Sequence, residues 1–449
     1  MTALTRRLCR AAGLALVFSV AVVQSLAAQT LVRDPDIEHA LDKLAAPVLT
    51  AAGLSPARVK VLVIQDSSLN AFVVDTEHIL IHSGLILKME RAEELQAVIA
   101  HEAAHIANGH ITRRLANIRS TRTAAGFGLL LAAAVAAVSG EAEAGAGLAM
   151  GTQSTAMRLL FVHTRAEEAS ADQAALRYMA SKGIDPTAMA DVLDIFRGQE
   201  ALSVGRQDPY VLTHPLTRDR IRAVEGYAAA YASRAEEHPE ADYWFARAKA
   251  KLGAFTRNPG WTLRQIRRND TSDLALMQRA IALHRVPKPD EALVQMNRLL
   301  ARRPNDPFLQ ELKGQLLLES RQTQAAVATY ARAVELAPSH PLILASYGRA
   351  LVALGSVDGA RRALDVLERA RTRDTRNPRM MRDLAVAYAR TGNNGMASLA
   401  TAERYALLGR LDDAEIHAER ASGLLPRGSP GWNRAQDVLN AAREAEKRR

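Results

Sequence analysis

Cysteine is nearly absent from this 449-residue sequence, and its single copy, Cys9, lies among the first ten residues. If Cys9 is lost with an N-terminal signal peptide, the mature chain has no thiol, so it forms no disulfide, has no thiol nucleophile and binds no metal through cysteine. Aromatic residues make up only 4% of the sequence, and almost none lie among the basic residues. This scarcity argues against a nucleic-acid surface, which combines basic with aromatic side chains. Any metal site must therefore use histidine and carboxylate ligands.

Long apolar runs are also scarce, and the first covers residues 11–23 behind a basic start. The small residues Ser25 and Ala27 supply a cleavage site, so we predict that residues 1–27 are a secretory signal peptide whose removal also removes Cys9. Loss of three signal arginines lowers the formal net charge from +10 to +7. This mild excess leaves attraction to anionic membrane surfaces or acidic partners open.

The second apolar run covers residues 124–138 and continues as an Ala/Gly-rich stretch to residue 151. It is shorter than the roughly 20 residues that a spanning helix needs. We predict that it is a buried helix or loop over the active site. Peripheral contact of residues 124–150 with a membrane is the alternative.

The length of the chain allows two globular domains, and its abundant Ala, Leu and Arg favour helices. β character is concentrated in three short runs, at residues 59–64, 70–74 and 78–82. Helical periodicity follows from residue 91 to about residue 119, and again from about residue 164 to residue 181. The fold class is therefore mainly α with a small β-sheet, and we predict one such domain over residues 28–267.

The C-terminal part repeats with a period of 34 residues. Small residues recur at this spacing in adjacent copies, namely Ala280 and Ala292, Gly314 and Ala326, and Gly348 and Ala360. Small side chains let paired helices approach, as in tetratricopeptide repeats (TPR), so we predict an all-α TPR solenoid over residues 268–449. A further unit at residues 405–426 is offset by about half a repeat, which predicts an unpaired extra helix near residues 385–402.

The segment His101-Glu102-Ala103-Ala104-His105 carries the clearest chemical signal. On a helix His101 and His105 lie one turn apart on the same face, so both imidazoles can bind one zinc ion. Glu102 lies beside them, and its carboxylate can take a proton from water that the metal has acidified. The remaining histidines of this part lack such spacing and are interpreted as structural or surface residues: His78, His82, His110 and His163.

A catalytic zinc ion needs a third protein ligand and an open fourth position. Glu168 is the candidate, because Asp172 lies one helical turn further on and is placed to orient a ligating histidine. Glu167 is the competing carboxylate. It points about 100° away on the same helix, as a solvated side chain would.

These residues resemble the HtpX-like zinc metallopeptidases, most closely their BepA-like periplasmic group, which joins the protease to TPR repeats. The matching pieces span nearly the whole mature chain: Asn70-Ala71-Phe72, His101 to His105, Arg165-x-x-Glu168-x-x-Ala171-Asp172, and His214-Pro215-Leu216-Thr217 with Arg220. The resemblance implies an α+β metallopeptidase domain of the gluzincin type with one zinc ion. Glu168 would be its third ligand and Asp172 a supporting acid. Ser170 stands where much of the family has an acid.

Two further residues have alternative interpretations. His214 precedes a proline and a helix start and is, from the residues alone, a turn residue. The resemblance implies that it is a regulatory fourth zinc ligand, which would keep the enzyme latent. Arg220 is interpreted either as a stabiliser of the tetrahedral oxyanion or as a partner in an ion pair on its helix.

The resemblance also implies where the protein works and on what. It implies a zinc endopeptidase in the periplasm of a Gram-negative bacterium, acting on misfolded or stalled outer-membrane proteins, with the TPR repeats docking the β-barrel assembly machinery. One alternative is a chaperone or adaptor with a latent zinc site. Another is an integral membrane protease of the HtpX type, anchored by the apolar stretch that begins at Ala124.

Overall fold

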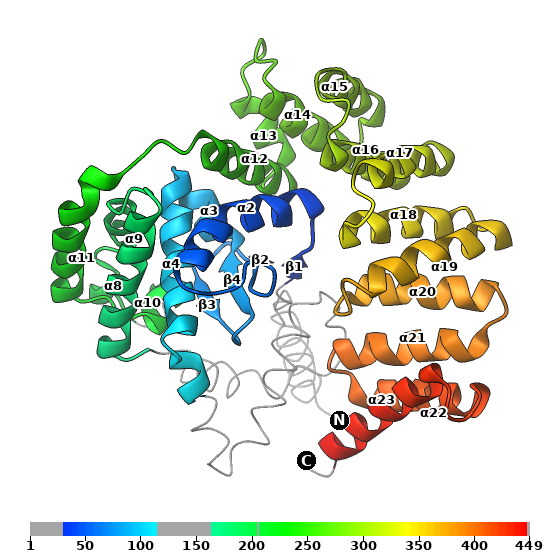
Figure 1. Cartoon of the computed structure of the whole chain (residues 1–449). Helices are drawn as coiled ribbons and strands as arrows, with labels where there is room; N and C mark the ends of the chain where they lie inside the picture. Colours follow the sequence, from blue (N-terminus) through cyan, green and yellow to red (C-terminus); the bar gives the residue numbers. More distant parts are fainter. Residues whose placement is uncertain (1–29, 115–162, 204–205, 447–449) are drawn as a thin grey trace, which may run out of the picture.

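A computed structural model of the protein describes residues 30–114, 163–203 and 206–446 (Figure 1). The predicted signal peptide and the apolar stretch at 124–150 lie outside the described residues. None of the described helices is both long and apolar enough to cross a membrane. The fold is mainly helical with one small sheet, followed by a stack of helical repeats, which confirms the predicted fold class.

The sheet has four strands in the order β1-β2-β4-β3, with bounds Thr30–Val32 (β1), Lys60–Gln65 (β2), Ala71–Val73 (β3) and His78–His82 (β4). β2 and β4 are parallel, whereas β1 and β3 are antiparallel to their neighbours. Alternate residues such as Val61 and Val63 join the main core of helices, and Leu80 belongs to a smaller apolar cluster with Ile64. The three predicted strands are confirmed, and β1 was not predicted.

Helices pack on the face of the sheet that carries Val61 and Val63 and form most of this part of the described chain. They are α2 (Pro35–Ala51), α3 (Ser83–Lys88), α4 (Ala92–Ala107), α8 (Arg165–Ser181), α9 (Ala188–Ile195), α10 (Pro209–Thr213), α11 (Arg218–Tyr231) and α12 (Pro239–Thr256). α4 is the central one, because Leu95, Val98 and Ile99 are fully buried in the main core and the helix packs on α2, α8 and α9. The segment from His101 to His105 therefore lies on a helix that is buried along nearly its whole length.

The long helix predicted from residue 91 to residue 119 is wrong at its C-terminal end. α4 ends at Ala107, Asn108 and Gly109 form a turn, and residues 110–114 begin a new helical segment. Gly109 has φ +69°, a left-handed conformation that glycine adopts at little cost and that ends many helices. The break turns His110 back toward α4.

In Figure 1 the helices of the C-terminal part run along the top and then down the right side of the view, coloured from green to red. Its helices are α13 (Pro259–Gln265), α14 (Asp273–Arg285), α15 (Pro289–Arg302), α16 (Pro307–Glu319), α17 (Thr323–Leu336), α18 (Pro341–Ala353), α19 (Val357–Arg371), α20 (Pro378–Arg390), α21 (Asn394–Leu407), α22 (Leu411–Leu424) and α23 (Pro430–Glu446). A single helix near 385–402 is wrong, because residues 391–393 form a turn between α20 and α21. α20 packs on both α19 and α21 and is therefore not unpaired.

Buried ion pairs join the repeats to the sheet domain. Arg247 on α12 lies 2.8 Å from Asp36 on α2 and 2.6 Å from Asp306 at the start of α16. Lys251, fully buried on the same helix, lies 2.8 Å from Asp34. α12 packs on both α2 and α14, so it is the element that connects the two parts. The domain limits 28–267 and 268–449 remain predictions.

We expect Gly348→Ala to lower the free energy of unfolding by about 1–3 kcal/mol, the usual cost of overpacking a core. A Cβ at this position of α18 would lie 2.4 Å from the side chain of Leu367 on α19, which is fully buried. Gly423→Ala in α22 is the matched control, because a Cβ there meets nothing within 4 Å. Urea unfolding should show this control at least as stable as wild type; equal stability of Gly348→Ala would contradict the packing argument.

Candidate metal centre

Helix α4 presents His101 and His105 on one face, as their spacing predicts. Their Nε2 atoms lie 3.0 Å apart, and both side chains are completely buried. Burial removes both imidazoles from water, and the loss of hydration costs free energy unless another group binds their nitrogen atoms. Burial indeed lowers the pKa of His105 well below its ordinary value, which favours the neutral form that binds a metal.

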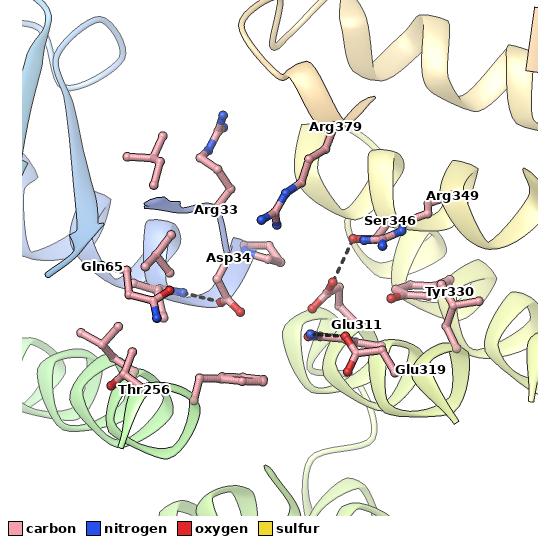
Figure 2. Close-up of a pocket in the computed structure, with 18 of the residues that line it drawn as sticks. Arg33, Asp34, Gln65, Thr256, Glu311, Glu319, Tyr330, Ser346, Arg349 and Arg379 are labelled. Carbon is pink, nitrogen blue, oxygen red and sulfur yellow. Dashed lines mark hydrogen bonds between the residues drawn. The ribbon is translucent and has the colours of Figure 1, made fainter. Parts of the chain in front are cut away.

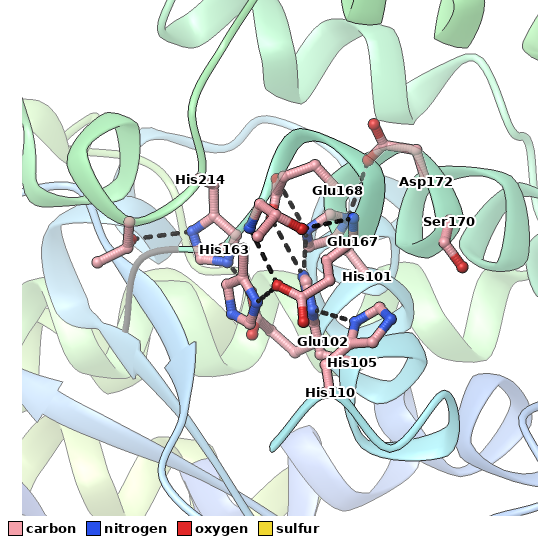
Figure 3. Close-up of polar contacts among 12 residues, drawn as sticks. His101, Glu102, His105, His110, His163, Glu167, Glu168, Ser170, Asp172 and His214 are labelled. Carbon is pink, nitrogen blue, oxygen red and sulfur yellow. Dashed lines mark hydrogen bonds and ion pairs between the residues drawn. The ribbon is translucent and has the colours of Figure 1, made fainter. Parts of the chain in front are cut away.

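Helix α8 brings Glu168 to the same point. Its carboxylate oxygens lie 3.3 Å from Nε2 of His105 and 3.6 Å from Nε2 of His101. His214, which follows α10, completes the group, and the four ligand atoms all lie within 4.8 Å of one another (Figure 3). Nε2 of His214 and both oxygens of Glu168 are buried and form no hydrogen bond among the described residues, although Glu102 lies 3.3 Å from that nitrogen and Arg220 lies 2.5 Å from one of the oxygens. Three buried histidines and a carboxylate whose ligand atoms lie this close together are a set that fits zinc.

Glu167, the competing carboxylate, points elsewhere. Its side chain accepts a hydrogen bond from the backbone N–H of Thr164 at 3.0 Å, while its own N–H donates to the Thr164 hydroxyl. This reciprocal pair is a capping box, which satisfies free N–H groups at the start of α8. Ser170 is exposed and accepts a hydrogen bond from Asn108, away from the candidate ligands.

Asp172 supports His101 from behind. Its Oδ1 lies 2.9 Å from Nδ1 of His101, so it orients the ring and leaves Nε2 free for a metal. Arg220 on α11 donates to both carboxylate oxygens, at 2.6 and 2.9 Å. Burial alone would raise the pKa of Asp172, but Arg220 and the hydrogen bond with His101 hold it well below its usual range. Asp172 therefore stays ionised.

Arg220 is almost fully buried and also lies 2.5 Å from Glu168. With its guanidinium directed at two acids of α8, this geometry favours the ion-pair interpretation over oxyanion stabilisation. The sequence predicted an ion pair within α11, but the observed pairs join α11 to α8.

Glu102 and His214 face each other across the site. Oε1 of Glu102 lies 3.3 Å from Nε2 of His214, and neither side chain contacts solvent appreciably. Burial opposes ionisation of Glu102, but His214 and the two neighbouring histidines lower its pKa below the ordinary value. The His214 ring is fixed by a 2.9 Å contact with the Thr213 hydroxyl and by stacking on Tyr210 at 4.4 Å. Glu102 is thus a carboxylate with one histidine directly opposite.

Two more histidines, His110 and His163, lie beside His105, although their positions in the sequence predicted only structural or surface residues. Nδ1 of His110 lies 2.9 Å from Nδ1 of His105, and the His163 ring packs on that of His105 at 3.6 Å. Nitrogen atoms of these three residues also lie close enough to one another to hold a metal, although His105 would be shared between both groups. The sequence signal for the contact with His105 was Asn108-Gly109, a dipeptide that ends helices. Because α4 ends there, the chain turns and brings His110 next to His105.

Comparison with known proteins agrees with this geometry. Residues 32–228 match Peptidase family M48, and residues 317–370 match a tetratricopeptide repeat. The beta-barrel assembly-enhancing protease of Escherichia coli (strain K12) is 23% identical over 427 residues, which cover 93% of this chain and 85% of that protein. A putative beta-barrel assembly-enhancing protease of Vibrio cholerae is 30% identical over 223 residues, covering 49% of this chain and 45% of that protein.

A mitochondrial metalloendopeptidase of Schizosaccharomyces pombe is 28% identical over 181 residues, which cover 40% of this chain and 49% of that protein. Its match is shorter than that of the Escherichia coli protein, which extends over both parts of the chain. The resemblance found from the motifs is thereby confirmed. The chain joins a Peptidase family M48 domain to tetratricopeptide repeats and is homologous along nearly its whole length to the beta-barrel assembly-enhancing protease of Escherichia coli.

Proposed function

We propose that the protein is a zinc-dependent endopeptidase in which His101, His105 and Glu168 hold one zinc ion and Glu102 is the general base. The observation that carries this proposal is the buried cluster of ligand atoms within 4.8 Å of one another, with the Glu102 carboxylate adjoining it. The match to Peptidase family M48 supports the reaction class.

A zinc ion bound there would polarise the scissile carbonyl and lower the pKa of water toward neutrality. Glu102 is ionised and enclosed, so it accepts the proton of the attacking water and then delivers it to the departing amine. Asp172 keeps His101 in the tautomer whose Nε2 is free. His110 supplies the equivalent contact to Nδ1 of His105.

His214 acts as the regulatory residue in this proposal. Its Nε2 belongs to the same group of ligand atoms and lies opposite Glu102, where the attacking water would have to be held. A histidine that fills the fourth position excludes that water and keeps the enzyme latent. The short helix α10 and the contact with Thr213 hold the ring in this position.

The biological role that we propose is quality control and assembly of outer-membrane β-barrel proteins in the periplasm. The signal peptide predicted at 1–27 would export the chain, and the repeats would dock the β-barrel assembly machinery. The printed names of the bacterial relatives and the 93% coverage of this chain support that role. Peripheral membrane contact through residues 124–150 remains part of the proposal, and no nucleic acid is involved.

The second candidate is a chaperone or adaptor in which the surface of the repeats binds other proteins and the zinc site is latent. It is favoured by one observation, the direct contact between His214 and Glu102, because a base blocked by a histidine is not free to act. Replacing Glu102 and His214 one at a time distinguishes the protease from the chaperone or adaptor.

Glu102→Gln should lower the rate of cleavage of an unfolded outer-membrane protein by about 10²–10⁴-fold, because the amide cannot accept the proton of water. Zinc content, measured by atomic emission, should equal that of wild type, since Glu102 is not a ligand in this proposal. Glu93→Gln on the same helix is the control and should cleave normally. Undiminished cleavage by zinc-loaded Glu102→Gln protein would reject the protease and favour the adaptor.

His214→Ala should raise the cleavage rate several-fold, because the fourth position becomes available to water while three ligands remain. The assay compares initial rates and zinc stoichiometry of wild type, His214→Ala and a distant control, His417→Ala. An unchanged or lower rate with one zinc ion still bound would contradict the regulatory role of His214. The assignment of Glu102 as the general base would be unaffected.

His110→Ala should weaken zinc binding by about 10–100-fold, the usual effect of removing a partner that orients a ligating histidine. Competition with a chelator measures this affinity independently of cleavage. Asp172→Asn tests the corresponding support of His101 and should weaken binding to a similar extent. An affinity of His110→Ala within twofold of wild type would show that the contact with His105 does not orient the ligand.

A further inference from the structure

A cavity of about 560 Å³ lies between the sheet domain and the repeats, outside the candidate metal centre. Figure 2 shows its two walls: Arg33, Asp34 and Gln65 on the side of the sheet, and Ser346, Arg349 and Arg379 on the side of the repeats. Glu311 on α16 lies between them. The cavity therefore exists only because the two parts of the chain are packed together.

Glu311 carries an acceptor that has no partner. Its side chain is 3% exposed, and Oε1 accepts a hydrogen bond from the Ser346 hydroxyl at 3.0 Å. Oε2 is buried and has no hydrogen-bond partner among the described residues. Burial raises the pKa of Glu311 to about 7, although Lys251 lowers it. A buried acceptor without a donor costs free energy that a bound N–H group would recover.

Two cations in the same cavity are also unpaired. Neither Arg349 on α18 nor Arg379 on α20 forms a hydrogen bond or ion pair with any described residue, and both are exposed. Partial burial and the charge of the nearby Arg349 lower the pKa of Arg379, while Asp383 acts in the opposite direction. The other charged groups of the walls are satisfied: Arg33 pairs with Asp374, and Glu319 accepts from His284. A carboxylate placed between the two free guanidinium groups would relieve their repulsion.

The opposite wall contains the edge of the sheet. In the described part of the chain, β1 pairs with β2 on one side and has no strand on the other. Leu31 and Val32 of β1 line the cavity. An unpaired strand edge offers main-chain N–H and C=O groups to any extended peptide that lies along it.

We infer that this cavity binds an extended peptide segment of a partner protein that carries an acidic side chain. The peptide pairs with the free edge of β1, its acid lies between Arg349 and Arg379, and one of its N–H groups donates to Oε2 of Glu311. The inference rests on the proposed docking function of the repeats and identifies where and how such docking occurs. It does not depend on peptide hydrolysis.

Fluorescence anisotropy with the full chain tests this binding. The probe is a labelled peptide with both ends blocked, of sequence Thr-Val-Asp-Val-Thr-Val, and its partner probe has Asn in place of Asp. Glu102→Gln protein is used beside wild type so that cleavage cannot consume the probe. We expect the Asp peptide to bind about tenfold or more tightly than the Asn peptide, the effect of one charge-assisted contact.

The double variant Arg349→Ala, Arg379→Ala should abolish that difference, and Glu311→Gln should weaken both peptides. Arg361→Ala, on the neighbouring helix α19 and outside the cavity, is the matched control and should bind as wild type. A thermal melt verifies that each variant is folded. Equal binding of the two peptides overturns the inference, as does normal binding by the double variant.

Two more outcomes also overturn it. One is that neither blocked peptide binds. The other is that only a peptide with a free C-terminal carboxylate binds, because the ligand would then be a chain end and not an acidic side chain. Either result would leave cleavage by wild type intact, so failure of this inference is distinguishable from failure of the proposed protease.

Discussion

The ion pair between Asp172 and Arg220 is the contact on which the candidate metal centre depends. Asp172 orients His101, and Arg220 binds both oxygens of that carboxylate and also reaches Glu168. One guanidinium thereby fixes two acids of α8 and ties α11 to it. Because all these groups are buried, loss of Arg220 would leave two carboxylates without their counter-charge, a change that typically costs about 3–5 kcal/mol.

The two histidines of the candidate metal centre that lie on α4 are held by different chemistry. A carboxylate contacts Nδ1 of His101, whereas a third histidine, His110, contacts Nδ1 of His105. Both contacts leave the Nε2 atoms turned toward Glu168. The support of His105 comes from outside α4, through the turn at Gly109, so the geometry of one ligand depends on where the helix stops.

The junction between the sheet domain and the repeats is built from charge as well as apolar contact. Arg247 and Lys251 project from α12 to the start of α2, and Arg33 reaches Asp374 beyond α19. These pairs hold the repeats beside β1 and enclose the cavity with Glu311 in it. The cavity is lined by residues of both parts, so neither part would form it alone.

Periodicity and spacing in the sequence determined much of this protein. The helical period put His101 and His105 on one face, alternation predicted β2, β3 and β4, and the 34-residue period predicted the repeats, because these patterns depend only on neighbours along the chain. The sequence had favoured Glu168 over Glu167, and the packing of α8 on α4 places Glu168 at the histidines. Tertiary structure alone decided that Arg220 pairs with Asp172 and that His110 contacts His105. Those contacts join residues from separate helices, and their distances follow from how the helices pack, which no local pattern encodes.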